Sequence, residues 1–198
     1  MKTGKVKANL DLQKSQSLTL TNVSDELLAT EQVTVTEIVF RQPSISDAAG
    51  IWRLVKACPS LDMNSPYAYL LWCRDFFSTS MVAYIGPELV GFVTGYLCPT
   101  EPTTLMVWQV SVSPAARRRR IATAMISGLV SSTPGVSSLE ATVTDDNLAS
   151  HRLFLALANR WQAPVHEEVL FLASAFPVPH QAERLYRIGP INRNGGRR

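Results

Sequence analysis

The pattern of apolar and polar positions changes character near residue 37. Residues 1–36 are rich in Lys, Thr, Ser, Gln and Val with weak periodicity, which is typical of a flexible or loosely attached leader. Farther along, apolar residues recur at alternate positions or at helical spacing as far as residue 191. We therefore expect a leader over residues 1–36, one domain over residues 37–191 and a disordered tail over residues 192–198.

Within this domain the pattern alternates between two kinds of element. Strand-like runs cover residues 38–43, 79–85, 89–97, 103–112, 139–144, 167–173 and 184–188. Helix-like runs cover residues 46–58, 66–77, 121–130 and 145–158, and Ser65 followed by Pro66 is a typical helix start. The order predicts an α+β fold with a mixed, mostly antiparallel central sheet flanked by helices.

Composition limits the class of protein. The chain has 198 residues, of which 46% are hydrophobic, and this is enough for one ordinary domain core. Its net charge of +3 does not call for a nucleic-acid-binding surface. No apolar stretch is long enough for a membrane span, and no signal-like apolar segment opens the chain, so we expect a soluble cytoplasmic protein.

The cysteines and the arginines carry more specific information. Cys58, Cys73 and Cys98 are odd in number and lack CxxC spacing, which argues against a disulfide framework and a zinc site and favours buried, reduced thiols. Four arginines, Arg117–Arg120, lie directly before a helix-like run, where a cation is disfavoured by roughly 0.3 to 1 kcal/mol. Free N–H groups of a first helical turn bind phosphate oxygens, so this position predicts a polyphosphate ligand.

An alternative is that the arginine run is a nuclear-localisation or RNA-binding tract. Such tracts usually lie in polar, aperiodic sequence. Here the run follows a strand-like segment that ends at Val112 and precedes an apolar helix that begins at Ile121. The context therefore favours a ligand-binding turn.

The turn resembles that of the GNAT superfamily of acetyltransferases, whose acyl-coenzyme A pattern is Q/R-x-x-G-x-G/A at a helix start. Arg117 and Ala122 match this pattern, and Arg120 stands in place of its first glycine. A second family segment, N-x-x-A/S-x-x-L-Y/F, is matched by Asn147, Ser150, Leu153 and Phe154. Many relatives carry a tyrosine at the last position, where it can protonate the leaving thiolate, whereas this chain has Phe154.

More specifically, four segments resemble the diaminobutyrate acetyltransferases of ectoine biosynthesis. They are LDMNSPYAYLLWC, WQVSVSPAAR, LEATVTDDNLASHRLF and HQAERLYRIGP, and the likeness covers about Ile38 to Pro190. It implies transfer of acetyl from acetyl-coenzyme A to the γ-amine of L-2,4-diaminobutyrate by a homodimer. It implies no metal, and its partners would be a small-molecule amine and a second copy, with no nucleic acid and no membrane.

The resemblance also implies which residues contact the two substrates. The implied contacts to acetyl-coenzyme A are Val110, Val112, Arg117, Arg118, Arg119, Arg120, Ile121, Ala122, Thr123, Asn147 and Ser150. The implied contacts to the amine are Asp62, Tyr67, Trp108, His180 and Glu183.

The reaction requires a proton acceptor. An alkyl ammonium with a pKa of about 10 must lose a proton before it attacks a thioester, and a carboxylate can accept it directly or through water. Asp62, Glu183 and Glu140 are the candidates, although Glu140 alternates with apolar residues in a strand and would do nothing chemical if it faced solvent. No cysteine is placed for an acyl-enzyme, so we expect direct attack in a ternary complex.

Structural alternatives stay open for the other residues. Asp62 also fits a turn before the second helix, Tyr67 and Trp108 fit core aromatics, and His180 with Glu183 fits a solvated loop pair. Two other functions also stay open. One is a GNAT acetyltransferase of another small amine or a peptide amine, and the other is a non-catalytic basic interaction module.

Overall fold

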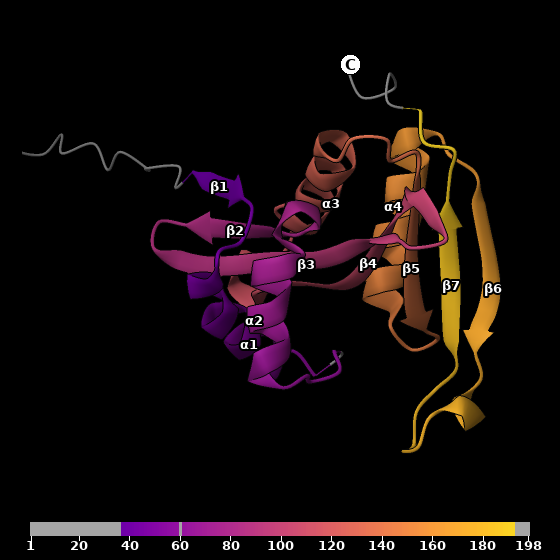
Figure 1. The fold of residues 1–198 in the computed structure, drawn as a ribbon, viewed down its shortest axis with the longest axis horizontal. Helices are drawn as coiled ribbons and strands as arrows, with labels where there is room; N and C mark the ends of the chain where they lie inside the picture. The colour runs from indigo at the N-terminus through magenta and orange to yellow at the C-terminus, as the bar shows by residue number, and fades with distance from the viewer. Residues whose placement is uncertain (1–36, 60, 193–198) are drawn as a thin grey trace, which may run out of the picture. The chain divides into compact units, whose positions relative to one another are not determined.

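A computed structural model describes residues 37–59 and 61–192, drawn in colour in Figure 1. The predicted leader, and the predicted tail beyond residue 192, lie outside these described residues. The elements in chain order are β1 (Ile38–Arg41), α1 (Ala48–Lys56), α2 (Pro66–Asp75), β2 (Met81–Ile85), β3 (Glu88–Cys98), β4 (Glu101–Val112), α3 (Ile121–Ser132), β5 (Ser138–Thr144), α4 (Leu148–Trp161), β6 (Val165–Phe171) and β7 (Glu183–Ile188).

The predicted α+β fold is confirmed, with differences at the ends of elements. Helix α2 stops at Asp75 rather than at residue 77, because the chain tightens into a 3-10 turn at Phe77–Thr79. Strand β6 begins at Val165, two residues before the predicted start, because Val165 pairs with Ile188 of β7. These ends depend on pairing and turn geometry rather than on the local apolar pattern.

The strands form one seven-stranded sheet in the order β1-β2-β3-β4-β5-β7-β6. All neighbours are antiparallel except β4 and β5, which run parallel. The parallel pairing extends only from Thr104 opposite Ser138 to Val107 opposite Ala141, although β4 continues to Val112 and β5 to Thr144. The two strands therefore separate in the middle of the sheet.

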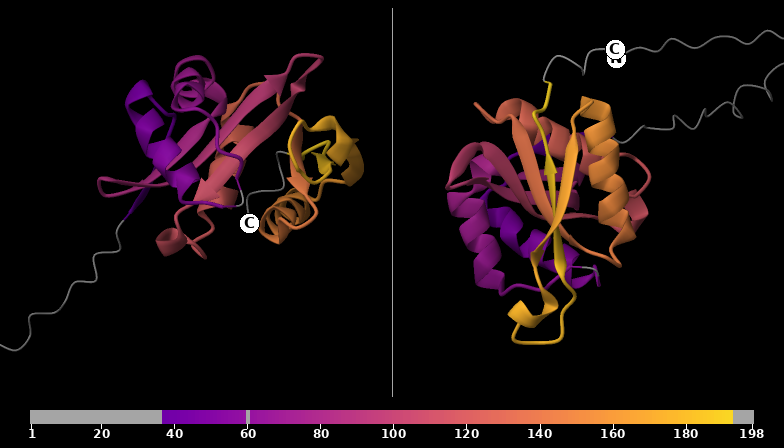
Figure 2. Two further views of the ribbon diagram at one scale, coloured as in Figure 1. Left: turned by 90° about the horizontal axis from the view of Figure 1, so that it is seen from below. Right: turned by 90° about the vertical axis from the view of Figure 1, so that its right-hand side faces the viewer.

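Helices cover both faces of this sheet (Figures 1 and 2). Helices α1 and α2 pack on one face through a buried cluster that consists of Ala48, Ile51, Val55, Tyr69, Cys73, Val82 and Phe92. Helices α3 and α4 pack on the other face, where Met125, Leu129 and Leu157 contact strand residues such as Leu105 and Leu139. Within residues 37–59 and 61–192, no helix combines the length and the apolar character that crossing a bilayer requires.

A β-bulge in β4 changes which side chains face α2. Thr94 of β3 pairs with Gln109 and Gly95 pairs with Val107, so Trp108 is an extra residue in the ladder. As a result, Trp108 and Gln109 both contact α2 instead of alternating: Trp108 stacks on Trp72, and Gln109 hydrogen-bonds to Tyr69. Gly95 permits this geometry, because a Cβ there would lie 2.6 Å from the Met106 carbonyl oxygen.

Asp47 joins β1, β2 and the start of α1. This residue is only 3% exposed, and its carboxylate accepts two hydrogen bonds of 2.7 Å from the Arg41 guanidinium. It also accepts bonds from the Tyr84 hydroxyl at 2.6 Å and from the Ser44 backbone N–H at 2.7 Å. Burial alone would raise the pKa of Asp47, but these donors outweigh it and hold the pKa well below the ordinary 3.8.

This network predicts acid sensitivity. Because the folded-state pKa of Asp47 is depressed, its stabilisation is full above about pH 4 and is lost as the pH falls below that value. Asp47→Asn should lower the free energy of unfolding by about 2 to 4 kcal/mol at pH 7, measured by urea titration. The difference in free energy of unfolding between Asp47→Asn and the wild type should become smaller as the pH falls from 5 to 2.

A control for this prediction is Asp75→Asn, which removes an exposed partner of Arg74. It should change the free energy of unfolding little at any pH in this range. A gap for Asp47→Asn that stays constant across the pH range would contradict the assignment.

Candidate active site

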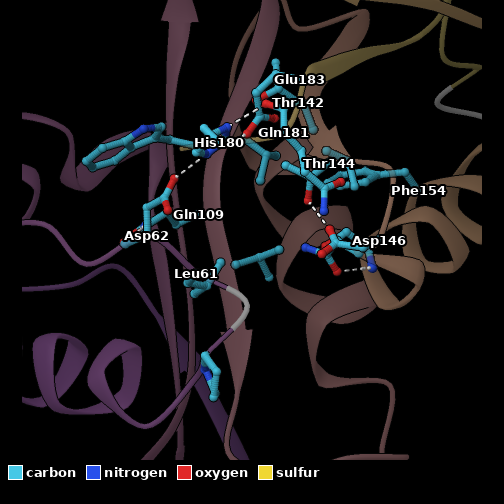
Figure 3. A pocket seen from close by; sticks show the side chains of 18 of the residues that line it. Leu61, Asp62, Gln109, Thr142, Thr144, Asp146, Phe154, His180, Gln181 and Glu183 are labelled. Carbon is cyan, nitrogen blue, oxygen red and sulfur yellow. Dashed lines mark hydrogen bonds and ion pairs between the residues drawn. The ribbon is translucent and has the colours of Figure 1, made fainter. Parts of the chain in front are cut away.

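A cavity of about 720 Å³ opens where β4 and β5 separate. Its walls come from both strands, from the start of α4, from the loop before α2 and from the loop before β7. Figure 3 shows Asp62, His180 and Glu183 gathered on one side of it, with Thr144 and Asp146 on the other. The fold thus brings together polar side chains that are more than 100 residues apart in sequence.

An acidic cluster lies at one end of this cavity. The His180 Nε2 atom lies 3.3 Å from Oδ2 of Asp62 and 3.8 Å from Oε1 of Glu183. The other ring nitrogen, Nδ1, lies 2.6 Å from the Gln181 carbonyl oxygen, which can only accept, so Nδ1 carries a proton. Phe176 stacks on the ring at 3.9 Å between centroids. The imidazole is therefore fixed between two carboxylates.

Electrostatics differ within the cluster. The hydrogen bond to the Gln181 carbonyl raises the pKa of His180, and Asp62 and Glu183 raise it further. Burial raises the pKa of Glu183, whose side chain is 16% exposed, against the opposing effects of Thr142 and His180. Asp62, with a side chain that is 79% exposed, keeps contact with water. Two carboxylates around one imidazole leave net negative charge even when the ring is protonated, which suits a ligand that carries ammonium groups.

Four of the five predicted amine contacts line this cavity, namely Asp62, Trp108, His180 and Glu183. Trp108 stacks on Trp72 with 4.5 Å between ring centroids and remains 36% exposed. Tyr67 does not line the cavity and is 64% exposed on α2. Within one copy of the chain, the prediction for Tyr67 therefore has no geometric support.

Glu140, the third candidate base, is not among the residues that line the cavity. Its carboxylate accepts a hydrogen bond from Arg187, its direct neighbour on β7, and a weaker one from Cys98. Its neighbour Ala141 lines the cavity, whereas Glu140 itself pairs with Met106 in the part of the sheet where β4 and β5 still share a ladder. The Glu140 carboxylate is paired with Arg187, and the candidate bases that line the cavity are Asp62 and Glu183.

A second, smaller cavity of about 280 Å³ lies at the start of α3. It is lined by Val112, Ala116, Arg117, Arg118, Arg120, Ile121, Ala122 and Thr123. The Ala124 N–H donates to the Arg120 carbonyl, so the amides of residues 121–123 precede this helical bond and lie free of the helix ladder. The predicted turn residues are thus assembled around a helix N-terminus, except that Arg119 does not line the cavity.

Comparison with known proteins agrees with this geometry. The model of the acetyltransferase (GNAT) family matches residues 49–158. The L-2,4-diaminobutyric acid acetyltransferase of Nocardia farcinica is 49% identical over 77% of this chain and 80% of its own. That of Chromohalobacter salexigens is 41% identical over 89% of this chain and 92% of its own. The chain belongs to the GNAT acetyltransferase family.

Solved structures extend the comparison. The diaminobutyrate acetyltransferase EctA from Paenibacillus lautus, solved with L-2,4-diaminobutyric acid and coenzyme A, is 40% identical with a TM-score of 0.77. The match covers 80% of this chain and 98% of that one. Ard1 from Thermoplasma volcanium is 17% identical with a TM-score of 0.61 over 77% of this chain and 97% of its own, and it shares the GNAT fold.

The second GNAT segment builds the remaining wall. Asn147 caps α4 by accepting a 3.2 Å hydrogen bond from the Ser150 N–H, and both residues line the larger cavity. Phe154 lines it as well, is 2% exposed and stacks against Tyr186. The position of the frequent GNAT tyrosine therefore carries no hydroxyl in this chain.

Sequence reasoning missed several lining residues, among them Gln109, Thr142 and Thr144. The two threonines lie in the strand predicted over residues 139–144. Treating the whole of that strand as a wall of the site would have included them. Gln109 gave no signal, because strict alternation places it on the opposite face from Trp108 and only the bulge brings the two together.

Arg120 adopts a left-handed conformation with φ +58°, in the position where the GNAT pattern has glycine. Such a conformation costs a residue with a Cβ about 1 kcal/mol. Arg120→Gly should therefore raise the free energy of unfolding by roughly 0.5 to 1 kcal/mol in urea titration. Its affinity for coenzyme A in calorimetry should stay within about threefold, because backbone N–H groups remain in place.

The matched control is Arg120→Ala, which also removes the guanidinium but keeps the strained backbone, and should be less stable than Arg120→Gly. A marked loss of coenzyme A affinity in both variants would show that the guanidinium, rather than the backbone, holds the phosphate.

Proposed function

We propose that this GNAT acetyltransferase transfers acetyl from acetyl-coenzyme A to the γ-amine of L-2,4-diaminobutyrate, giving N4-acetyl-L-2,4-diaminobutyrate in ectoine biosynthesis. The observation that carries the substrate assignment is the Asp62–His180–Glu183 cluster at the cavity between β4 and β5. Relatives named for this activity are 36 to 49% identical over most of the chain.

Acetyl-coenzyme A lies along the open edge of β4 in this proposal. Val112 lines the cavity at α3 and Val110 lines the cavity between β4 and β5, so the two cavities border the same strand about 7 Å apart. Beyond Val107, β4 has no β5 partner, and its backbone groups on that edge can bond to the pantetheine amides. The diphosphate rests on the amides of residues 121–123.

Diaminobutyrate brings two ammonium groups and one carboxylate. Asp62 and Glu183 hold the ammonium groups, and His180 supplies the cationic partner for the substrate carboxylate. Trp108 forms an apolar wall that limits the size of the acceptor. This arrangement suits a small zwitterion better than a long peptide.

Glu183 is the general base of the proposal. Burial raises its pKa, which makes its carboxylate a better proton acceptor than an exposed one, whereas Asp62 is largely solvated. The neutral amine then attacks the thioester carbon, and a backbone N–H near Val110 stabilises the oxyanion. As the intermediate collapses, the proton left on the attacking nitrogen moves to the departing thiolate, since Phe154 cannot supply one.

The properties of the cysteines support direct transfer of the acetyl group, without an acyl-enzyme. Burial raises the pKa of the Cys73 and Cys98 thiols to about 11, so both stay protonated and are poor nucleophiles near neutral pH. Cys73 is buried as predicted, whereas Cys58 and Cys98 are only partly buried. Protonated thiols also fit the reducing cytoplasm in which we place the protein.

The functional test is acetylation of diaminobutyrate by the purified protein. Glu183→Gln should lower kcat/KM for the amine by at least about 100-fold, because proton acceptance is lost, and should leave coenzyme A affinity within about twofold. Glu140→Gln is the matched control, since it removes an acid outside the cavity and should retain the activity.

Two outcomes would contradict the proposal. Negligible turnover of diaminobutyrate beside rapid acetylation of a peptide panel would favour a peptide acetyltransferase. A Glu140→Gln variant that loses activity while Glu183→Gln keeps it would reverse the assignment of the base.

We further propose a homodimer that forms through β6. This strand lies at an edge of the sheet, and its residues Val169, Leu170 and Phe171, with Leu172 directly after it, are 42 to 65% exposed. The register shift opposite Arg184 and Glu183 makes Leu170 an extra residue in the ladder, and its side chain is exposed. An exposed apolar edge strand is a site for pairing with another chain. In this proposal a second copy of the chain occupies it.

Leu170→Lys should therefore shift the protein from dimer to monomer in light scattering coupled to size-exclusion chromatography. Leu155→Lys is the matched control, because Leu155 has the same 42% exposure but lies on α4. A wild type that is monomeric at all concentrations, or a Leu155→Lys variant that dissociates instead, would contradict the β6 interface.

A further inference from the structure

Gln109 makes a buried link that the proposed mechanism does not use. This residue of β4 is 6% exposed and reaches the loop before α2, where its Nε2 donates to the Asp62 carbonyl oxygen at 2.8 Å. Its Oε1 accepts a 3.1 Å hydrogen bond from the Tyr69 hydroxyl, and Tyr69 is fully buried in α2. One side chain thus connects the sheet, a helix and the loop that carries Asp62.

The orientation of this amide is fixed by its partners. The Asp62 carbonyl can only accept a hydrogen bond, so the amide NH₂ must face it. The amide oxygen then faces Tyr69, whose hydroxyl donates to it. Both polar atoms of the Gln109 side chain are therefore satisfied in one arrangement, and exchanging them would place two acceptors against each other.

The loop that Gln109 contacts has little regular structure of its own. The segment from Leu61 to Ser65 contains no helix or strand. The Asp62 carbonyl also accepts a long, 3.4 Å bond from Asn64, a neighbour in the same loop, which does not connect the loop to the sheet. The Asp62 side chain is 79% exposed, so packing does not determine where its carboxylate lies.

We propose that Gln109, oriented by Tyr69, is a positioning residue that sets affinity for the amine by holding Asp62 at the cavity. This inference rests on the proposed function, in which the Asp62 carboxylate binds an ammonium group. The β4 bulge makes it possible, because Trp108 and Gln109 then lie side by side toward α2. The same irregularity forms the apolar wall and holds the backbone of Asp62.

The kinetic test uses two variants that remove the donor to Asp62. Gln109→Met keeps the length of the side chain without polar atoms, and Gln109→Glu keeps the acceptor for Tyr69. Both should raise KM for diaminobutyrate about tenfold, the typical effect of one lost hydrogen bond, because the backbone of Asp62 loses its link to β4. KM for acetyl-coenzyme A, and kcat at saturating amine, should stay within about twofold.

Tyr69→Phe tests the orienting role. It should raise KM for the amine about threefold through looser orientation of the amide. The double variant with Gln109→Met should be no worse than Gln109→Met alone, because both changes break the same link. Additive effects of the two changes would show that Tyr69 does not act through Gln109.

A titration without substrate separates positioning from general stability. The hydrogen bond to the Gln181 carbonyl raises the pKa of His180 first, and contacts with Asp62 and Glu183 raise it further. If Asp62 moves away in Gln109→Met, the pKa of His180 should fall relative to the wild type in NMR titration. The chain has three histidines, so loss of one signal in His180→Gln identifies the resonance.

The control for stability is Ile188→Val, a fully buried change at the far end of β7 from Glu183. It should destabilise the fold without altering KM for the amine or the His180 titration. Should Gln109→Met behave in the same way, the residue is merely structural and the inference is overturned. Because the titration needs no turnover, it decides this point even if the wild type does not acetylate diaminobutyrate.

Discussion

The short parallel pairing of β4 with β5 is the constraint on which the rest of this structure depends. The two strands share a ladder only from Thr104 to Val107 on β4, and then each continues without the other. Two consequences follow from the separation: a cavity forms in the middle of the sheet, and the backbone edge of β4 is left open to a ligand. Val110 and Val112 of this strand line the larger cavity and the smaller cavity at the start of α3, respectively, so the two cavities border the same strand. A molecule with a diphosphate at one end and a reactive group at the other fits that edge.

Three carboxylates of this chain have different roles because their surroundings differ. Asp47 is buried among strong donors, and its pKa is depressed, so it remains charged and joins β1, β2 and α1. Glu183 is also largely buried, but its donors are weaker and burial raises its pKa. Glu140 is bound to Arg187 and lies outside the cavity. Residue type alone does not distinguish these roles, whereas the number and charge of the donors around each carboxylate do.

Two departures from the GNAT pattern line different cavities. Arg120 takes the left-handed conformation of a glycine, so the backbone path of the turn is preserved at a cost in strain. Phe154 keeps the aromatic ring of the usual tyrosine in a buried stack with Tyr186, so the packing is preserved without the hydroxyl. In both cases the local shape is maintained, while a guanidinium is gained at Arg120 and a hydroxyl is lost at Phe154.

The sequence by itself determined the local elements and the place of the arginine turn. Periodicity and turn residues gave every strand and helix to within a few residues, since these signals act over short stretches of chain. It also placed the arginines of the turn at the start of α3. Only the tertiary structure decided that Glu140 pairs with Arg187, that Tyr67 lies outside the cavity and that Gln109 joins Trp108 on one face. Those facts depend on the register between strands and on contacts between residues 40 or more positions apart, and no local pattern encodes them.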